Sequence, residues 1–164
     1  MQQPRGSNLG SGHLLECRSM EIQGGCHCGN LRYTLGWRGE PAAIPARACT
    51  CSFCSRHGAA WTAHPEATLA IEAADAAAIS RYAFETETAE FWVCTRCGVV
   101  PACTSRIDGR DYAVVNANTF DDADMPVVRA PATFDGEDEA RRLQRRAGRW
   151  IGTVRFGPAP VTGA

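Results

Sequence analysis

The stretch GGCHCGNLRYTL, residues 24–35, joins a close pair of cysteines to a strand signal. Apolar residues at positions 31, 33 and 35 alternate with polar ones, which is typical of a strand with one buried face. Cys26 and Cys28 therefore lie in a turn at the end of a predicted strand, and Gly29 follows the second cysteine. The fold is expected to form around this turn.

A second pair has the same form in FWVCTRCGVV, residues 91–100, where Cys94 and Cys97 are followed by Gly98. Glycine adopts positive φ at little cost, which lets a turn direct its backbone N–H groups toward thiolate sulfurs. Two such turns, each at a strand end, can face one another and supply four thiolates. Four thiolates are the ligand set of a closed, structural zinc site.

Two other interpretations of these pairs remain open. Cys94 and Cys97 could form a thioredoxin-like redox pair, although the βαβ context of that motif is missing. A zinc ribbon that binds nucleic acid would have CxxC at both ends, whereas the first pair here is CxC. Structural zinc is the favoured interpretation.

A third cluster lies in RACTCSFCSRHGAA, residues 47–60, which contains Cys49, Cys51 and Cys54. Three protein ligands with an open fourth position are typical of catalytic zinc. His57, one helical turn after Cys54, could close the site instead and leave it purely structural. In an open site, His57 is the candidate proton donor and Arg56 the candidate anchor for a substrate carboxylate. The residues alone leave the open and closed forms equally supported.

The remaining pattern indicates a mainly β protein with one C-terminal helix. Further strands are expected at 67–72, 79–83, 90–93, 99–105 and 111–116, with a turn at Asp108–Gly109. Acidic residues open and arginines end the segment EDEARRLQRRA, residues 137–147, which predicts a helix that stops at Gly148. The alanine-rich segment 73–80 is too short for a secure helix.

The length and composition of the chain limit the classes of function that the protein can have. The 164 residues fit one domain, with residues 1–19 as a disordered leader or a wrongly assigned start, 20–156 as the domain and 157–164 as a frayed tail. A net charge of −1 gives no field for nucleic acid, no apolar run is long enough for a membrane span, and no secretory signal is visible, so a cytoplasmic protein is expected. All seventeen basic residues are arginine, which excludes a Schiff-base lysine and a P-loop.

Three segments of this chain resemble, in the same order, the cysteine motifs of the glutathione-dependent formaldehyde-activating enzyme family, also called the GFA or centromere-protein-V-like domain family. The segments are GGCHCGNLRY, CTCSFCSRHGA and FWVCTRCG. The resemblance runs from Met20 to Phe156 and implies a small, mainly β fold of the Mss4-like type. It implies two zinc ions per chain. The structural ion would be held by Cys26, Cys28, Cys94 and Cys97, and the catalytic ion, with an open fourth position, by Cys49, Cys51 and Cys54.

The resemblance also implies an activity. The protein would be a carbon–sulfur lyase-type enzyme, similar to an S-(hydroxymethyl)glutathione synthase, in which a zinc-bound thiolate of glutathione or a similar thiol attacks formaldehyde or another small aldehyde. The alternative is a non-catalytic binding or redox-sensing domain whose second zinc is closed by His57.

Other residues are given structural roles. Cys103 is expected to be a small buried side chain in a strand, and Trp61, Phe91 and Trp92 are expected in the core rather than in a substrate wall. The arginines of segment 137–149 are expected to form an ordinary solvated helix face, since acidic residues share that helix.

Overall fold

The computed structural model describes residues 19–158, which form a mainly β structure in two sheets. The strands are β1 (Ser19–Gly25), β2 (Leu31–Arg38), β3 (Ile44–Cys49), β4 (Ala60–Thr62), β5 (Thr68–Ala73), β6 (Ile79–Tyr82), β7 (Glu90–Cys94), β8 (Ala102–Ile107), β9 (Arg110–Asn116), β10 (Val127–Ala132) and β11 (Thr153–Pro158). The helices are α1 (Ser52–His57) and α2 (Glu139–Arg149), and two 3-10 turns are η1 (Ala76–Ala78) and η2 (Ala117–Thr119). The fold class expected from the sequence is confirmed.

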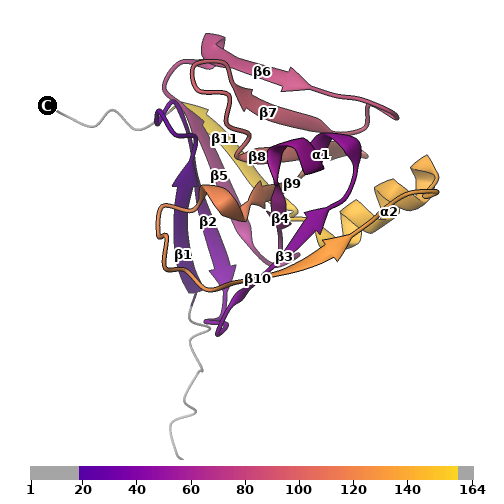
Figure 1. The fold of residues 1–164 in the computed structure, drawn as a ribbon, viewed down its shortest axis with the longest axis horizontal. Helices are drawn as coiled ribbons and strands as arrows, with labels where there is room; N and C mark the ends of the chain where they lie inside the picture. The colour runs from indigo at the N-terminus through magenta and orange to yellow at the C-terminus, as the bar shows by residue number, and fades with distance from the viewer. Residues whose placement is uncertain (1–18, 159–164) are drawn as a thin grey trace, which may run out of the picture.

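The strand order explains how the sheets are built. The smaller sheet has the order β1-β2-β5-β11, and the larger has the order β10-β3-β4-β9-β8-β7-β6. Most neighbours are antiparallel, but β11 pairs with β5 and β10 pairs with β3 in parallel. In Figure 1, the small sheet stands on one side of the molecule and α2 lies on the other, beyond the larger sheet.

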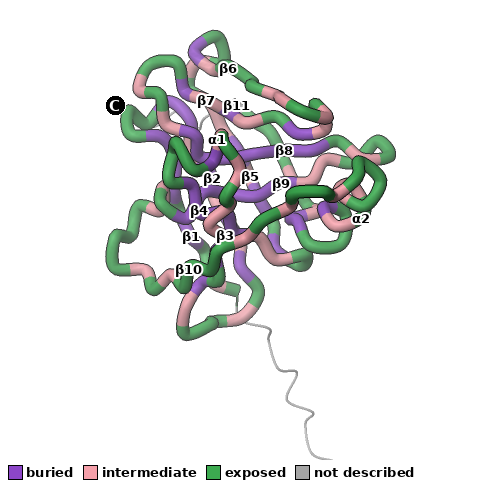
Figure 2. The backbone as a smooth tube through the Cα atoms, turned by 45° about the vertical axis from the view of Figure 1, so that its right-hand side comes forward, coloured by how far each residue is buried: buried purple, intermediate pink, exposed green. Residues whose placement is uncertain are grey.

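The core lies between the two sheets. In β2 the side chains of Leu31, Tyr33, Leu35 and Trp37 are buried while the intervening ones are less so, as the alternation in the sequence predicts. Burial of each such side chain stabilises the fold by about 1.5–3 kcal/mol. Figure 2 shows that the buried backbone is concentrated in the central strands, with exposed segments at the rims.

The turn predicted at Asp108–Gly109 joins β8 to β9. Both residues have positive φ, 48° and 78°. This combination is required by the tight hairpin turns that match the twist of antiparallel strands. The Asp-Gly signal in the sequence therefore predicted the correct connection.

Helix α2 corrects one expectation. Gly148 was expected to end the helix, but α2 continues to Arg149 and is capped by Trp150, whose N–H donates to the carbonyl of Arg146 at 2.8 Å. Gly148 is not among the glycines with positive φ, so it does not act as a left-handed cap. Instead, Ile151 pairs with Ala113 of β9 and fixes the end of the helix to the larger sheet.

The ends of the chain are described only in part. Of the predicted leader, residues 1–18 lie outside the described residues, as do residues 159–164 of the predicted tail. Strand β11 continues to Pro158, two residues past the expected domain end at Phe156. Within residues 19–158 no helix is long and apolar enough to cross a membrane.

Candidate metal centres and cavity

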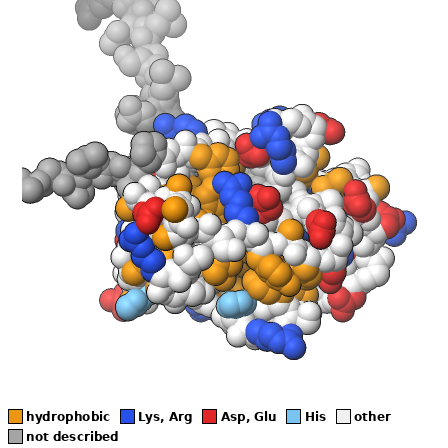
Figure 3. Space-filling view, turned by 90° about the horizontal axis from the view of Figure 1, so that it is seen from above, with side chains coloured by type: hydrophobic (Ala, Val, Ile, Leu, Met, Phe, Trp, Pro, Cys, Tyr) orange, Lys and Arg blue, Asp and Glu red, His pale blue; other side chains and the backbone are white. Residues whose placement is uncertain are grey.

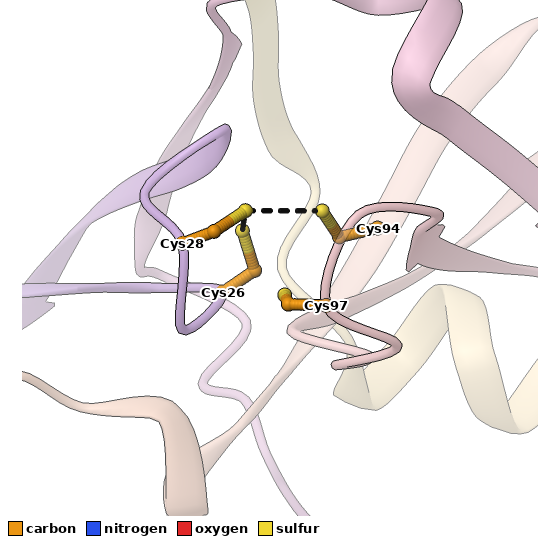
Figure 4. Close-up of side chains that lie close together, drawn as sticks. All are labelled: Cys26, Cys28, Cys94 and Cys97. Carbon is orange, nitrogen blue, oxygen red and sulfur yellow. Dashed lines mark hydrogen bonds between the residues drawn. The ribbon is translucent and has the colours of Figure 1, made fainter.

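Four cysteines from two distant turns come together at one end of the core. Cys26 and Cys28 lie in the β1–β2 turn, and Cys94 and Cys97 lie at the end of β7 and in the turn after it. Their sulfur atoms all lie within 4.8 Å of one another. Figure 4 shows the two turns facing each other with all four side chains directed into the space between them.

The sulfur positions are compatible with zinc. Cys28 Sγ lies 3.6 Å from Cys26 Sγ and 3.5 Å from Cys94 Sγ. A tetrahedral zinc ion with Zn–S bonds of about 2.3 Å separates its sulfurs by about 3.8 Å. Coordination would therefore require only small movements of the side chains.

The backbone of both turns is directed at the sulfurs. Gly29 and Gly98, which follow the second cysteine of each pair, have φ of 77° and 76°, as the sequence predicted. The Leu31 N–H donates to Cys26 Sγ at 3.2 Å. Burial acts to raise the pKa of Cys97, but hydrogen bonds from the backbone N–H groups of Val99 and Cys28 outweigh it and lower the pKa to about 6.

The second group consists of Cys49, Cys51 and Cys54, whose sulfurs also lie within 4.8 Å of one another. Cys49 is the last residue of β3, Cys51 caps the N-terminus of α1, and Cys54 lies within that helix. The cap is formed by Cys51 Sγ, which accepts the Cys54 N–H at 3.4 Å. Helix α1 ends at Gly58, which has φ of 59°. A single strand–turn–helix unit therefore brings the three thiols together.

The environment of this group favours one thiolate, at Cys49. A hydrogen bond from the Cys54 thiol, opposed by burial, lowers the pKa of Cys49 to about 6, and the same pairing raises the pKa of Cys54. The Trp61 indole N–H donates to Cys54 Sγ at 3.2 Å. Hydrogen bonds of this kind stabilise sulfur that carries negative charge. The donor set is that of a three-thiolate metal site.

The three cysteines open onto a cavity of about 110 Å³. Its lining combines thiols, aromatic rings and arginines: Arg47, Cys49, Cys51, Cys54, Trp61, Phe84, Glu85, Thr86, Ala89, Phe91, Cys103, Val114, Phe134, Asp135, Arg142, Arg145, Arg146 and Trp150. The expected core placement is confirmed for Trp61 and Trp92, and Trp61 and Phe91 additionally line the cavity.

The aromatic wall continues to the surface. Phe53 of α1 packs against Tyr82, Phe84 and Phe91 with ring centroids 5.0, 5.4 and 4.6 Å away. Tyr82 is 45% exposed. Figure 3 shows hydrophobic side chains gathered in patches on the face seen from above, with arginines and histidines beside them.

The arginines of α2 were expected to form a solvated face. Arg141 and Arg149 are exposed, as expected, but the structure contradicts the expectation for the other three. Arg146 is only 7% exposed, and the side chains of Arg142 and Arg145 are 17% exposed. The helix turns this face toward the cavity. The signal in the sequence was the spacing of the arginines at 142, 145 and 146, which lie on one face of a helix at positions normally occupied by apolar core residues.

The predicted proton donor and carboxylate anchor lie elsewhere. His57 is exposed at the end of α1, where its ring packs on Phe53 at 4.7 Å, and it is not a member of the three-cysteine group. Arg56 is exposed and its guanidinium donates to the Ser52 carbonyl of the same helix. Neither residue lines the cavity, so their catalytic roles stay predictions.

Cys103 is buried in β8, as expected, at 2% exposure. Its thiol also forms part of the cavity wall, and burial raises its pKa to about 12. It belongs to neither cysteine group. It is therefore a neutral wall residue beside the second group.

Comparison with known proteins agrees with this arrangement. The sequence model described as glutathione-dependent formaldehyde-activating enzyme matches residues 21–134. A crystal structure of a Rhodobacter sphaeroides protein is 28% identical, covering 65% of this chain and 99% of that one, with a TM-score of 0.46. No curated protein matches. The matched range contains every cysteine of both groups, and the chain belongs to the glutathione-dependent formaldehyde-activating enzyme family, whose fold is a small β fold of the Mss4-like type.

Proposed function

We propose that this protein is a zinc-dependent carbon–sulfur lyase-type enzyme that adds glutathione, or a similar thiol, to formaldehyde or another small aldehyde. The proposal also takes residues 20–156 as the functional unit. The observation that carries it is the three-cysteine group at the floor of a cavity, with His57 outside that group. The alternative, a binding or redox-sensing domain, would have His57 as the fourth metal ligand. This arrangement does not support that alternative.

The two cysteine groups have different proposed roles. Cys26, Cys28, Cys94 and Cys97 would hold a structural zinc, since four thiolates complete its coordination. A second zinc, held by Cys49, Cys51 and Cys54, would stabilise the thiolate form of a substrate thiol at neutral pH.

The reaction forms one bond and consumes no cofactor. The substrate sulfur forms a bond to the aldehyde carbon, the π electrons of the carbonyl move to its oxygen, and that oxygen takes up a proton equivalent to the one the thiol lost. The protein's part is to hold the two reactants together and to restrict water, which can account for a large share of the rate enhancement. The buried rings of Trp61 and Trp150 and the half-buried ring of Phe91 suit this role.

Proton delivery to the new hydroxyl is the open step in the proposal. His57 remains the residue to test, because imidazole titrates near neutral pH. In His57→Ala, a donor role predicts lost turnover with unchanged zinc content, and unchanged turnover would dismiss it. Arg56→Ala provides the matched variant on the same exposed end of α1, and it tests the anchoring role predicted for that residue.

The central experiment measures the interconversion of glutathione and S-hydroxymethylglutathione in the presence of formaldehyde by exchange NMR. The zinc-loaded protein should accelerate this exchange in proportion to its concentration. Cys51→Ser should abolish the acceleration while preserving the fold, since serine is also a good helix N-cap. Ser55→Ala, an exposed change on the same helix, is the control and should leave the rate unchanged. Exchange that is insensitive to the protein, or to Cys51→Ser, would overturn the proposal.

A binding measurement complements the assay. Calorimetric titration of glutathione in two buffers of different ionisation enthalpy should reveal release of a proton on binding, and Cys51→Ser should abolish it. Binding without proton release would contradict capture of the thiol as thiolate.

A further inference from the structure

The cavity next to the three-cysteine group is lined by four arginines. Arg47 comes from β3, while Arg142, Arg145 and Arg146 come from α2, which lies past the end of the family match at residue 134. Buried guanidinium groups are costly unless anionic or polar partners compensate them. The partners of each arginine therefore indicate which charges are available to a ligand.

Two of the four are already paired with carboxylates. Arg145 donates from Nε and Nη2 to both oxygens of Glu137, at 2.8–3.1 Å, and stacks over the Phe134 ring at 3.8 Å. Arg142 donates from Nη1 to Glu85 at 2.9 Å. These two guanidinium groups hold the cavity rim together.

The other two have no carboxylate partner within residues 19–158. Within the described residues, Arg146 donates only from Nη1, to the neutral oxygens of Thr88 and Ser105, at 2.8–3.3 Å. Its Nε is buried and, like Arg142 Nε, has no hydrogen-bond partner among residues 19–158. Arg47 has neither an ion pair nor a side-chain hydrogen bond in the described part of the chain, although it is half-buried. Burial lowers the pKa of both guanidinium groups, to about 10 for Arg146, and positively charged neighbours act in the same direction.

We propose that Arg47 and Arg146 bind a carboxylate of the ligand that enters the cavity. A carboxylate accepts hydrogen bonds from guanidinium in a planar, bidentate arrangement, and it would supply the negative charge that these two side chains lack. The proposal gives the anchoring role to the cavity wall rather than to the exposed Arg56.

The cavity also limits the size and the polarity of the ligand. Its volume is about 110 Å³, and aromatic rings line it together with the arginines and the cysteines. A short apolar chain that carries a carboxylate at one end fits this lining. Where the ligand also carries a thiol, which rests on the function proposed above, the substrate class is a compact mercaptocarboxylate or the corresponding part of a larger thiol.

Four small probe molecules separate the proposed carboxylate binding from the proposed thiol chemistry. 3-Mercaptopropionate carries both groups, 3-mercaptopropionamide lacks the charge, butyrate replaces the thiol by a methyl group, and butyramide lacks both. Calorimetric binding to the zinc-loaded protein should be at least about tenfold weaker for each amide than for its acid. If the proposed thiol chemistry alone is wrong, butyrate will bind as well as 3-mercaptopropionate, and both will still bind better than the amides.

Variants test the residues. Arg47→Gln and Arg146→Lys should reduce the preference for acid over amide, whereas Arg141→Gln, a 77% exposed arginine of the same helix, should keep it. Arg47→Gln carries the test if the buried Arg146 variant does not fold, as judged by circular dichroism. Equal binding of acids and amides, no binding of either acid, or a preference unchanged in Arg47→Gln would overturn the proposal.

Discussion

Removing Cys94 tests whether the four-cysteine group holds the fold together through a metal ion. Cys28 and Cys94 are 66 positions apart in the chain. Closing a loop of that length in the unfolded chain costs about 4 kcal/mol of conformational entropy at about 25 °C. A metal cross-link that persists in the unfolded chain therefore stabilises the fold by about this amount. This is a large part of the stability of a typical domain, about 5–15 kcal/mol.

The assay is urea unfolding of the zinc-loaded protein, followed by circular dichroism. With a urea slope of about 2 kcal/mol per molar, Cys94→Ala should lower the unfolding midpoint by about 2 M. A strong chelator should lower the midpoint of the unsubstituted protein by a similar amount and should have little further effect on the variant. Zinc content, measured in parallel, should fall by one ion per chain.

The control is Cys103→Ala, which also deletes a buried sulfur but lies in neither cysteine group. It should cost only about 1 kcal/mol, because it leaves a small cavity and breaks no cross-link. If Cys94→Ala destabilises the protein no more than Cys103→Ala, or if the chelator leaves the unsubstituted protein unchanged, the reasoning is refuted.

Three other residues near the two sites give further tests. Trp61→Phe removes the N–H donated to Cys54 Sγ, so zinc affinity of the second group should fall about tenfold in competition with a chromophoric chelator, and equal affinity would contradict this. The Arg145 guanidinium holds the pKa of Glu137 below its ordinary value of 4.5, so this carboxylate stabilises the fold above that pH and the stabilisation is lost as the pH falls through the lowered value. The acid-side decline of stability should therefore be shallower in Glu137→Gln, and a decline as steep as that of the unsubstituted protein would count against the pairing. Gly98→Ala forces a side chain into φ of 76° and should cost about 1 kcal/mol in urea unfolding, more than Gly98→Asn, since asparagine tolerates this conformation.

The sequence predicted which cysteines come together, because each pair or cluster is formed by residues close in the chain. Short spacings such as CxC and CxxC place two sulfurs on one turn, and the glycine after each pair reports the turn geometry directly. Strand β2 was equally clear, since its alternation reflects burial of one face. These features depend on neighbours in the chain.

The cavity could not be predicted in the same way, because it depends on contacts between distant segments. Arg47 and the arginines of α2 are about a hundred positions apart in the sequence, and only the folded chain brings them to one wall. Arginine is normally a surface residue, so a stripe of arginines was interpreted as a solvated face. Gly148 was likewise interpreted as a helix end, although the position of the end is set by Trp150 and the pairing of Ile151 with β9.

The cavity is assembled from parts of the chain that evolution can change separately. One part of its wall is the turn from Cys49 to Cys54, where coordination of a metal would leave little freedom for substitution. Three of its wall residues, Arg142, Arg145 and Arg146, come from α2, which supplies no cysteine to either group. Under the proposed function, substitutions in that one helix would alter which molecules are accepted while the cysteine-bearing turns stay intact. Such a division would let one chemistry spread to new substrates through a few changes in a single helix.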